Sequence, residues 1–115
     1  MRLKCVNITT VQPVVMREFY AAVFASPWRE IVPGRWEIDA GGVVIALLQS
    51  ETPAAVQNDC SGLEFSVEDV DAEYRRLSAL GIATEGEPVT YPWKYRCFGF
   101  KDPDGNGLYF VQYVG

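Results

Sequence analysis

Few side chains in this chain could do chemistry, and histidine is absent from all 115 residues. The candidates are three cysteines, the carboxylate of Glu64 and the hydroxyl of Tyr109. Cys5 has no histidine to activate it, and such free cysteines are commonly small, buried and inert. A lone glutamate such as Glu64 in an apolar cleft can act as a base or hold a cation. The residues therefore indicate proton transfer or ligand binding rather than histidine-based catalysis.

Glu64 and Tyr109 also have purely structural interpretations. Glu64 could pair with a nearby arginine, and the sequence offers Arg75, Arg76 and Arg96. Tyr109 could be an ordinary packing residue of a strand. Both interpretations stay open at this point.

Aromatic rings supply a second kind of chemistry. Trp28, Trp36 and Trp93 lie near prolines and glycines, which predicts that they belong to turn regions at the rim of a pocket. Aromatic faces stack on planar ligands and attract cations. Tryptophans are more often core or interface anchors, so this role competes with the first.

Strands must position these residues, because side chains alternate between the two faces of a strand. If Tyr109 faces a cleft, Val111 does so too, while Leu108 and Phe110 face the core. The same alternation favours a cleft-facing position for the polar residues of two other predicted strands: Cys5, Asn7, Thr9, Glu64 and Ser66.

The apolar periodicity predicts two similar halves. In the first half we expect strands at 3–10, 36–39 and 43–49, and a helix over 14–24 with Pro13 in its first turn. The apolar face of this helix is expected at Val15, Phe19, Ala22 and Val23. In the second half we expect strands at 63–67, 85–89, 95–101 and 108–113, and a helix from Glu68 or Asp69 to about Leu80. Residues 51–59 lack periodicity and are typical of a linker.

This order predicts an α+β fold in a single domain, residues 1–115, built from two tandem βαβββ modules at 1–55 and 60–115. The modules are expected to form a curved mixed sheet with outer helices and a central cleft, the usual place for a ligand. Each half alone is too small to bury a core.

Composition narrows the function. The net charge of −5 argues against nucleic acid, which needs a basic face. No apolar run approaches the roughly 20 residues that span a membrane. Three cysteines, an odd number spaced far apart, do not indicate a disulfide framework. We therefore expect a cytoplasmic protein.

Several motifs resemble the glyoxalase/bleomycin resistance protein/dioxygenase (vicinal oxygen chelate) superfamily. The segment Phe98 to Val111, with Asp-Pro-Asp-Gly-Asn-Gly at its centre, resembles that family's last hairpin. The segment 66–82 resembles its second strand-to-helix step, and Phe19-Tyr20 falls where the family has an aromatic pair. Pro92-Trp93 followed by Arg96 is similar to a Pro-Trp-Gly-x-Arg stretch, with Lys94 in place of the glycine.

The resemblance implies four metal-ligand positions, usually His or Glu. They fall on Cys5 or Asn7, on Ala46, on Gly62 with Glu64 nearby, and on Tyr109. Alanine and glycine have no ligating side chain, and a catalytic metal needs about three protein ligands. We therefore expect neither metal nor other cofactor.

The resemblance is closest to the family's bleomycin-resistance-like branch, which implies a homodimer that sequesters an antibiotic or toxin-like molecule. The expected ligand is small and planar, and a cationic group on it is an open alternative. The aromatic, proline-bounded segment 26–36 is a candidate dimer contact. The predicted ligand-binding residues are Cys5, Asn7, Trp36, Glu64, Ser66, Trp93, Arg96, Phe98 and Tyr109.

Two alternatives compete with sequestration. One is a metal-free lyase or isomerase that uses Glu64 or Tyr109 in proton transfer, which ranks lower because no second catalytic group supports it. The other is a structural or regulatory remnant whose cleft is filled by side chains. The sequence does not name the ligand.

Overall fold

The computed structural model describes residues 1–52 and 62–115, and the chain divides into two compact units, Met1–Ala55 and Val56–Gly115. We call them the first and the second module. Most of the predicted linker lies outside the described residues, as does Cys60. No helix in the described part of the chain is long and apolar enough to cross a membrane.

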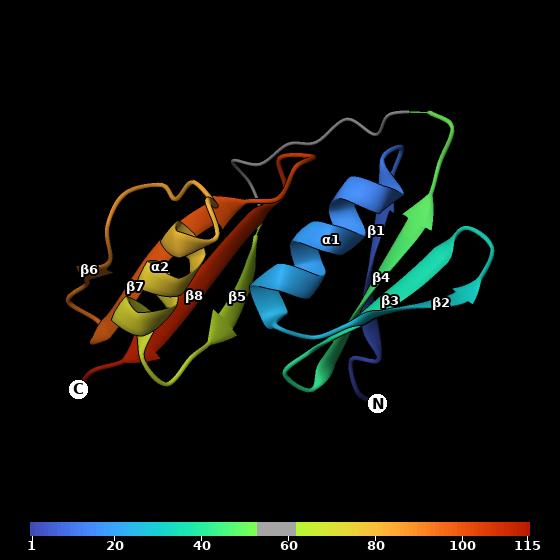
Figure 1. Cartoon of the computed structure of the whole chain (residues 1–115). Helices are drawn as coiled ribbons and strands as arrows, with labels where there is room; N and C mark the ends of the chain where they lie inside the picture. The colour runs from blue at the N-terminus through green and yellow to red at the C-terminus, as the bar shows by residue number, and fades with distance from the viewer. Residues whose placement is uncertain (53–61) are drawn as a thin grey trace. The chain divides into compact units, whose positions relative to one another are not determined.

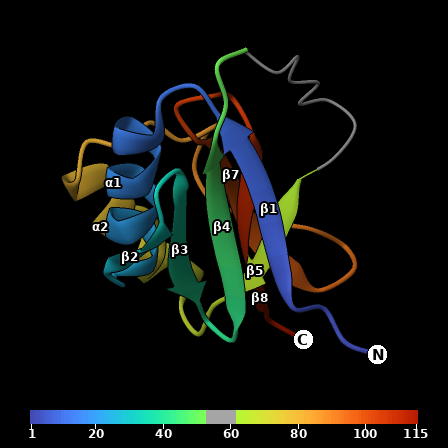
Figure 2. The same ribbon diagram turned by 90° about the vertical axis from the view of Figure 1, so that its right-hand side faces the viewer.

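The first module has one helix on a four-stranded sheet (Figure 1). Its elements are β1 (Cys5–Thr10), α1 (Pro13–Phe24), β2 (Trp28–Val32), β3 (Arg35–Ala40) and β4 (Val43–Gln49). The strand order is β1-β4-β3-β2, with β1 parallel to β4 and the other pairs antiparallel. Figure 2 shows β1 beside β4, with β3 on the other side of β4.

The second module repeats this topology. Its elements are β5 (Leu63–Ser66), α2 (Val70–Ala79), β6 (Val89–Thr90), β7 (Tyr95–Lys101) and β8 (Gly107–Tyr113). The strand order is β5-β8-β7-β6, and β5 is parallel to β8. The predicted α+β class and the tandem βαβββ modules are confirmed, although the strands form two four-stranded sheets rather than one continuous sheet.

Two element predictions for strands need correction. β2 was not predicted, because Pro27, Pro33 and Gly34 indicate turns on both sides of it. The strand expected at 85–89 is displaced to Val89–Thr90, and Thr84 instead forms an isolated bridge with Phe100. Short edge strands carry little hydrophobic periodicity, so local sequence defines them poorly.

The two helices begin as the sequence predicts. Pro13 stands in the first turn of α1, and the side chain of Asp69 accepts a hydrogen bond from the Ala72 amide at the start of α2. The face of α1 differs from the expected one. Met16, Tyr20 and Val23 are buried, whereas Val15 is 49% exposed. The predicted stripe began one residue too early because two overlapping apolar stripes exist on this helix.

Each sheet has one face covered by its own helix. In both modules this face holds most of the buried apolar side chains, which lie at alternate positions of the central strands. They are Trp36, Ile38, Ala40, Ile45 and Leu47 in the first module, and Phe98, Phe100, Leu108 and Phe110 in the second. The residues of opposite parity therefore lie on the face that α1 or α2 does not cover.

The hairpin between β7 and β8 is organised by Asp102. One carboxylate oxygen accepts hydrogen bonds from the amides of Asp104 and Asn106, both at 2.9 Å, and the other accepts from Asn106 Nδ2 at 2.8 Å. Asp102 is only 4% exposed, so these bonds satisfy a buried carboxylate. The predicted turn is confirmed, and Asp102 has a structural task.

A second turn joins β6 to β7 and contains a strained residue. The amide of Lys94 donates to the carbonyl of Tyr91 at 3.0 Å, and its own carbonyl accepts from the Val114 amide at 2.9 Å. These bonds hold Lys94 at φ 68°, in the left-handed region that favours glycine. The lysine that departs from the family pattern thus keeps a glycine-like backbone.

Replacing Lys94 with glycine should therefore stabilise the protein. The left-handed conformation costs a residue with a Cβ about 1–2 kcal/mol, and the greater chain entropy of glycine offsets part of the gain. We expect K94G to raise the free energy of unfolding by about 1 kcal/mol in urea titrations. K94A is the matched control, because alanine removes the ammonium group but keeps the strain, and it should show no such gain. Equal gains in both variants would contradict this account.

Candidate functional site

The helix-free face of the second module brings together most of the chemistry-bearing residues of that half. Glu64 pairs with Tyr109, and Tyr109 pairs with Gly99. In the next row Ser66 pairs with Val111, which pairs with Cys97. These rows run across β5, β8 and β7, and the predicted Glu64, Ser66 and Tyr109 share this face. We call it the Tyr109 face.

The ring of Tyr109 lies over two glycines, one on each neighbouring strand. A Cβ added at Gly62 would lie 2.6 Å from Tyr109 Cε2, and one added at Gly99 would lie 3.0 Å from Cε1. Either distance is too short for an ordinary carbon–carbon contact. The missing side chains of Gly62 and Gly99 therefore create the room that the tyrosine ring occupies, and the half-buried ring forms a broad aromatic surface on the sheet.

Glu64 is exposed beside this ring, and two of its three expected arginine partners are engaged elsewhere. Arg96 forms a bidentate pair with Asp71 on α2, at 2.9 and 3.0 Å, and Arg76 pairs with Glu73 at 2.7 Å. The described residues offer Glu64 no ion pair. A carboxylate without a counterion on an aromatic surface is suited to a cationic group of a ligand.

Cys97 is a member of this face that the sequence did not single out. Burial raises the pKa of its thiol, and the negative charge of Glu64 raises it further. The thiol is therefore protonated at neutral pH and is a weak nucleophile. Strand parity could have identified Cys97, because it is in the same alternation as Gly99 on β7.

Arg96 and Phe98 lie on the opposite face of β7, which corrects their predicted place in one lining with Tyr109. Phe98 is 3% exposed and packs edge to face on Tyr74 of α2, with ring centroids 5.5 Å apart. Arg96 holds Asp71 and donates to the hydroxyl of Thr90 at 3.1 Å. Its guanidinium holds the pKa of the Asp71 carboxyl below its ordinary value. Both residues attach α2 to the sheet.

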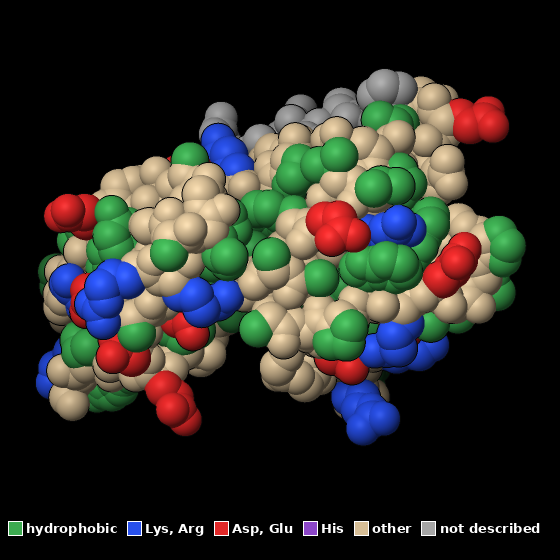
Figure 3. Space-filling view, in the orientation of Figure 1, with side chains coloured by type: hydrophobic (Ala, Val, Ile, Leu, Met, Phe, Trp, Pro, Cys, Tyr) green, Lys and Arg blue, Asp and Glu red, His purple; other side chains and the backbone are tan. Residues whose placement is uncertain are grey.

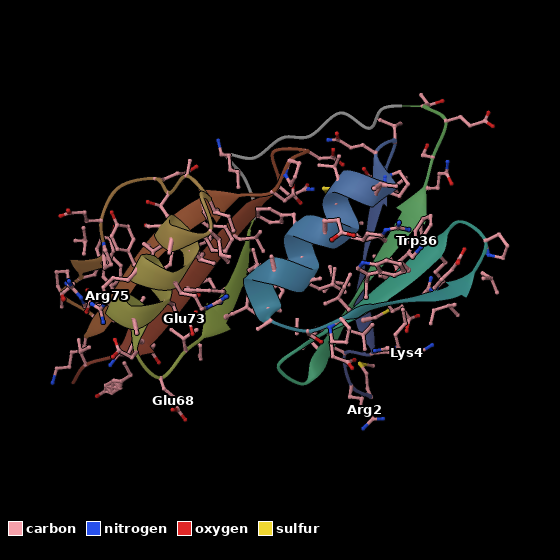
Figure 4. All side chains as sticks on the ribbon, in the orientation of Figure 1. Arg2, Lys4, Trp36, Glu68, Glu73 and Arg75 are labelled. Carbon is pink, nitrogen blue, oxygen red and sulfur yellow. The ribbon has the colours of Figure 1, made fainter. Side chains whose placement is uncertain are left out.

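Two of the three tryptophans lie in strands rather than in the predicted turns. Trp36 is 7% exposed, belongs to β3 and lies beside α1 (Figure 4), with its ring centroid 5.5 Å from the Arg17 guanidinium. Trp28 begins β2, and the Arg17 guanidinium lies 4.0 Å from its ring centroid. Trp36 therefore packs beneath a helix and does not share the face of Cys5 and Asn7. Trp93 alone lies in a turn, 65% exposed and stacked on Tyr91.

The helix-free face of the first module is polar. Cys5, Asn7 and Thr9 lie on β1, and the register places Ala46 of β4 between Asn7 and Glu37 of β3. The thiol of Cys5 donates to Asn7 Oδ1 at 3.3 Å. The predicted Cys5 and Asn7 thus lie side by side on this face.

Two arginines on this face form ion pairs, although the Arg29 side chain stays 44% exposed. Arg35 Nε donates to Glu37 at 3.0 Å, and its Nη2 lies 4.0 Å from Cys5 Sγ. Arg29 bridges Glu37 at 3.6 Å and Asp39 at 2.9 Å. The hydrogen bond to Glu37 raises the pKa of Arg35 above its ordinary value, so the guanidinium stays charged.

The donor set does not fit the metal that the family resemblance implies. Within residues 1–52 and 62–115 no three His, Cys, Asp or Glu side chains group closely enough to hold a metal ion. Of the four expected positions, Ala46 and Gly62 have no donor atom, and the Tyr109 ring covers the space beside Gly62. A catalytic site of the usual kind needs about three ligands.

Surface charge is mixed. In the view of Figure 3, basic and acidic side chains are interspersed with hydrophobic ones on both modules. That face offers no basic patch of the kind on which nucleic acids bind.

Comparison with known protein families assigns the chain to one of them. A family model described as the Glyoxalase/Bleomycin resistance protein/Dioxygenase superfamily matches residues 2–110. No curated protein sequence matches the chain significantly.

Solved structures share the fold. A glyoxalase/bleomycin resistance protein/dioxygenase from Nocardioides is 24% identical, with a TM-score of 0.77, covering 99% of this chain and 84% of its own. A lactoylglutathione lyase from Agrobacterium tumefaciens is 21% identical, with a TM-score of 0.75 and coverages of 96% and 92%. The fosfomycin resistance protein FosX from Listeria monocytogenes is 15% identical, with a TM-score of 0.81 and coverages of 97% and 93%. Identities this low establish the fold alone.

The fit between Tyr109 and Gly62 can be tested by a double-mutant cycle. G62A should destabilise the protein by about 1–3 kcal/mol, because the new methyl group collides with the ring. In a Tyr109→Ala background the same change should cost little, since the ring is gone. Urea unfolding of the four proteins measures the coupling. An equal cost of G62A in both backgrounds would show that the ring does not occupy this space.

Proposed function

This chain belongs to the glyoxalase/bleomycin resistance protein/dioxygenase superfamily, and on that premise we propose that it sequesters a small planar organic molecule of the antibiotic or toxin type. The observation that carries the proposal is the Tyr109 ring, spread over Gly62 and Gly99 beside an exposed Glu64 that has no ion pair with any residue of 1–52 or 62–115. We further propose that binding needs no metal ion.

Stacking is the larger of the two expected contributions. An aromatic pair contributes about 0.5–1.5 kcal/mol beyond the apolar area that it buries. An exposed ion pair such as one with Glu64 contributes about 0.2–1 kcal/mol and is screened by salt. We therefore infer that the planar shape of the ligand determines affinity, and that a positive charge adds selectivity.

Related structures support this class of function without defining the ligand. The Listeria protein FosX is described as a fosfomycin resistance protein, which shows a resistance function on this fold. That the ligand of this chain is an antibiotic or toxin-like molecule is proposed from the Tyr109 face and from this resistance function together.

A metal-free lyase or isomerase is the second candidate. Glu64 lies close enough to Cys97 to influence its thiol, so the Tyr109 face holds a carboxylate, a protonated thiol and a phenol together. Such groups could move a proton on a bound substrate. Chemical change of a bound compound, followed by chromatography, would favour this candidate over sequestration.

The first test is a titration of intrinsic fluorescence with planar antibiotics, including bleomycin-type and quinoxaline-type compounds, confirmed by calorimetry. We expect saturable binding that a chelator does not alter. Tyr109→Ala should weaken it by about 1 kcal/mol, roughly fivefold. Glu64→Gln should weaken only cationic compounds, and less so at high salt.

The matched charge control is Glu68→Gln. Glu68 is exposed and points into solvent before α2 (Figure 4), so its removal should leave every affinity unchanged. A panel in which no compound binds, or in which Tyr109→Ala binds like the parent protein, would contradict the proposed function. Binding that a chelator abolishes would contradict metal independence.

We also propose that the protein is a cytoplasmic homodimer in which β2 contributes to the contact. β2 is the outer strand of its sheet, and Ile31 and Val32 on it are 46% and 55% exposed. Such exposed apolar side chains on an edge strand favour association. Sedimentation should show a dimer, and Val32→Lys should shift it towards monomer by placing a charge in the contact. A parent protein that is monomeric at working concentration would contradict this proposal.

A further inference from the structure

The guanidinium group of Arg35 lies beside two positions where the family resemblance places metal ligands. Arg35 is on β3 and Cys5 is on β1, with β4 between them. Because Arg35 Nη2 comes within 4.0 Å of Cys5 Sγ, the side chain must cross β4. In the register Arg35 pairs with Leu48 of β4 and Cys5 pairs with Val44, so the diagonal from Arg35 to Cys5 passes Ala46, which lies between Asn7 and Glu37. Alanine presents only a methyl group at this position.

The guanidinium is held in place before any ligand arrives. The Arg35 side chain is 24% exposed and Glu37 is 20% exposed, so the pair is largely withdrawn from solvent. Glu37 is itself fixed by Arg29 at 3.6 Å, and Arg29 is fixed by Asp39 at 2.9 Å. A chain of ion pairs across β2 and β3 therefore orients Arg35 towards β1. Pre-organisation of this kind lowers the entropic cost of binding.

On the β1 side of Arg35 the unused polar groups are hydrogen-bond donors or hydroxyls, whereas the carboxylate of Asp39 lies on the β3 side and pairs with Arg29. Asn7 Oδ1 already accepts from the Cys5 thiol, which leaves its Nδ2 group as a donor. Nη1 of Arg35, Nδ2 of Asn7 and the hydroxyl of Thr9 have no hydrogen-bond partner within the described residues. Asn7 and Thr9 are exposed, so a ligand can reach them. Lys4, directly before β1, adds positive charge at its start (Figure 4).

We infer that this face of the first module is a binding site for an oxyanion, such as a carboxylate or phosphonate group, with Arg35 as the cation and Asn7 and Thr9 as further donors. A guanidinium presents its donors in a planar fork that matches these groups. The permanent cation takes the part that a metal ion would play in attracting oxygen atoms. The inference goes beyond the proposed function, because it needs neither Tyr109 nor Glu64.

The competing interpretation is that Arg29, Arg35, Glu37 and Asp39 only stabilise the sheet through cross-strand ion pairs. The two interpretations differ in one respect. A structural network is complete without a ligand, whereas a binding site must respond to a small anion at Arg35 and Asn7 specifically.

The experiment is a titration of the full chain with benzoate and, separately, methylphosphonate, followed by nuclear magnetic resonance of the Arg35 Nε and Asn7 Nδ2 groups. Benzamide is the uncharged probe of matched shape. We expect saturable shifts of both groups with at least one anion, with a dissociation constant in the millimolar range, and no shift with benzamide. Binding of one anion alone identifies which oxyanion fits. Absence of saturable shifts with both anions, or shifts elsewhere only, would overturn the inference.

Arg35→Gln should weaken anion binding by about tenfold or more. Arg76→Gln makes the same charge change in the second module and should leave it unchanged. If both variants lose the same anion affinity, the loss comes from the change in net charge and not from Arg35, and the inference is overturned. Titration of the parent protein needs no variant, so the inference stays testable if Arg35→Gln fails to fold. Planar-ligand binding by Tyr109 is measured separately, so failure of one proposal is distinguishable from failure of the other.

Discussion

The two-residue period of the β-strand is the constraint on which this structure depends. Once α1 and α2 cover one face of each sheet, every strand residue is committed to the core or to the opposite face. Phe110 and Tyr109 are chain neighbours, yet Phe110 is 2% exposed among packed aromatic rings while Tyr109 lies across two glycines on the other side. A shift of one residue would bury Glu64 beneath the helix without a partner, at a large desolvation cost. Core packing therefore also fixes which groups a ligand can meet.

On the helix-free faces, large side chains lie over residues that have a small side chain or none. Gly62 and Gly99 accommodate the ring of Tyr109, and Ala46 lies where the side chain of Arg35 crosses β4. In each case the residue that lacks a donor atom is matched by a nearby side chain that brings other chemistry, an aromatic surface or a permanent cation. The small residues and their large neighbours are thus sterically coupled. A histidine or glutamate at position 62 would collide with the ring of Tyr109 unless the ring moved.

Sequence reasoning identified most of the fold because its strongest signals are local. Pro13, Asp69 and the Asp102 turn each act within a few residues of their own position, and the structure has each of them as expected. Strand alternation also placed Glu64, Ser66 and Tyr109 on one face. The failures concern information that is not local. Apolar spacing did not decide between the two stripes of α1, because the choice depends on the sheet beneath it.

Side-chain partners were the least predictable part of the site. Arg96 reaches Asp71 on α2, 25 positions away in sequence, and this pairing removed it from the Tyr109 face. The ion pair of Arg35 was not predicted, although its partner Glu37 lies two residues away on the same face of β3. Long charged side chains can point in several directions, and their choice depends on the neighbouring strand. Cys97, in contrast, is predictable from strand alternation, because it has the same parity as Gly99 on β7 and the opposite parity to Arg96 and Phe98.

The groups on both helix-free faces share one electrostatic property that separates them from a metal centre. A metal site built from histidine or cysteine binds its ion only when those ligands are deprotonated, so its affinity varies with pH. This chain has no histidine, the side chain whose charge ordinarily changes near neutrality. Burial and Glu64 keep the Cys97 thiol protonated, and Glu37 keeps Arg35 charged. The Cys97 thiol and the Arg35 guanidinium therefore each keep one charge state across the neutral range, whereas the histidine or cysteine ligands of a metal centre change theirs when the ion binds.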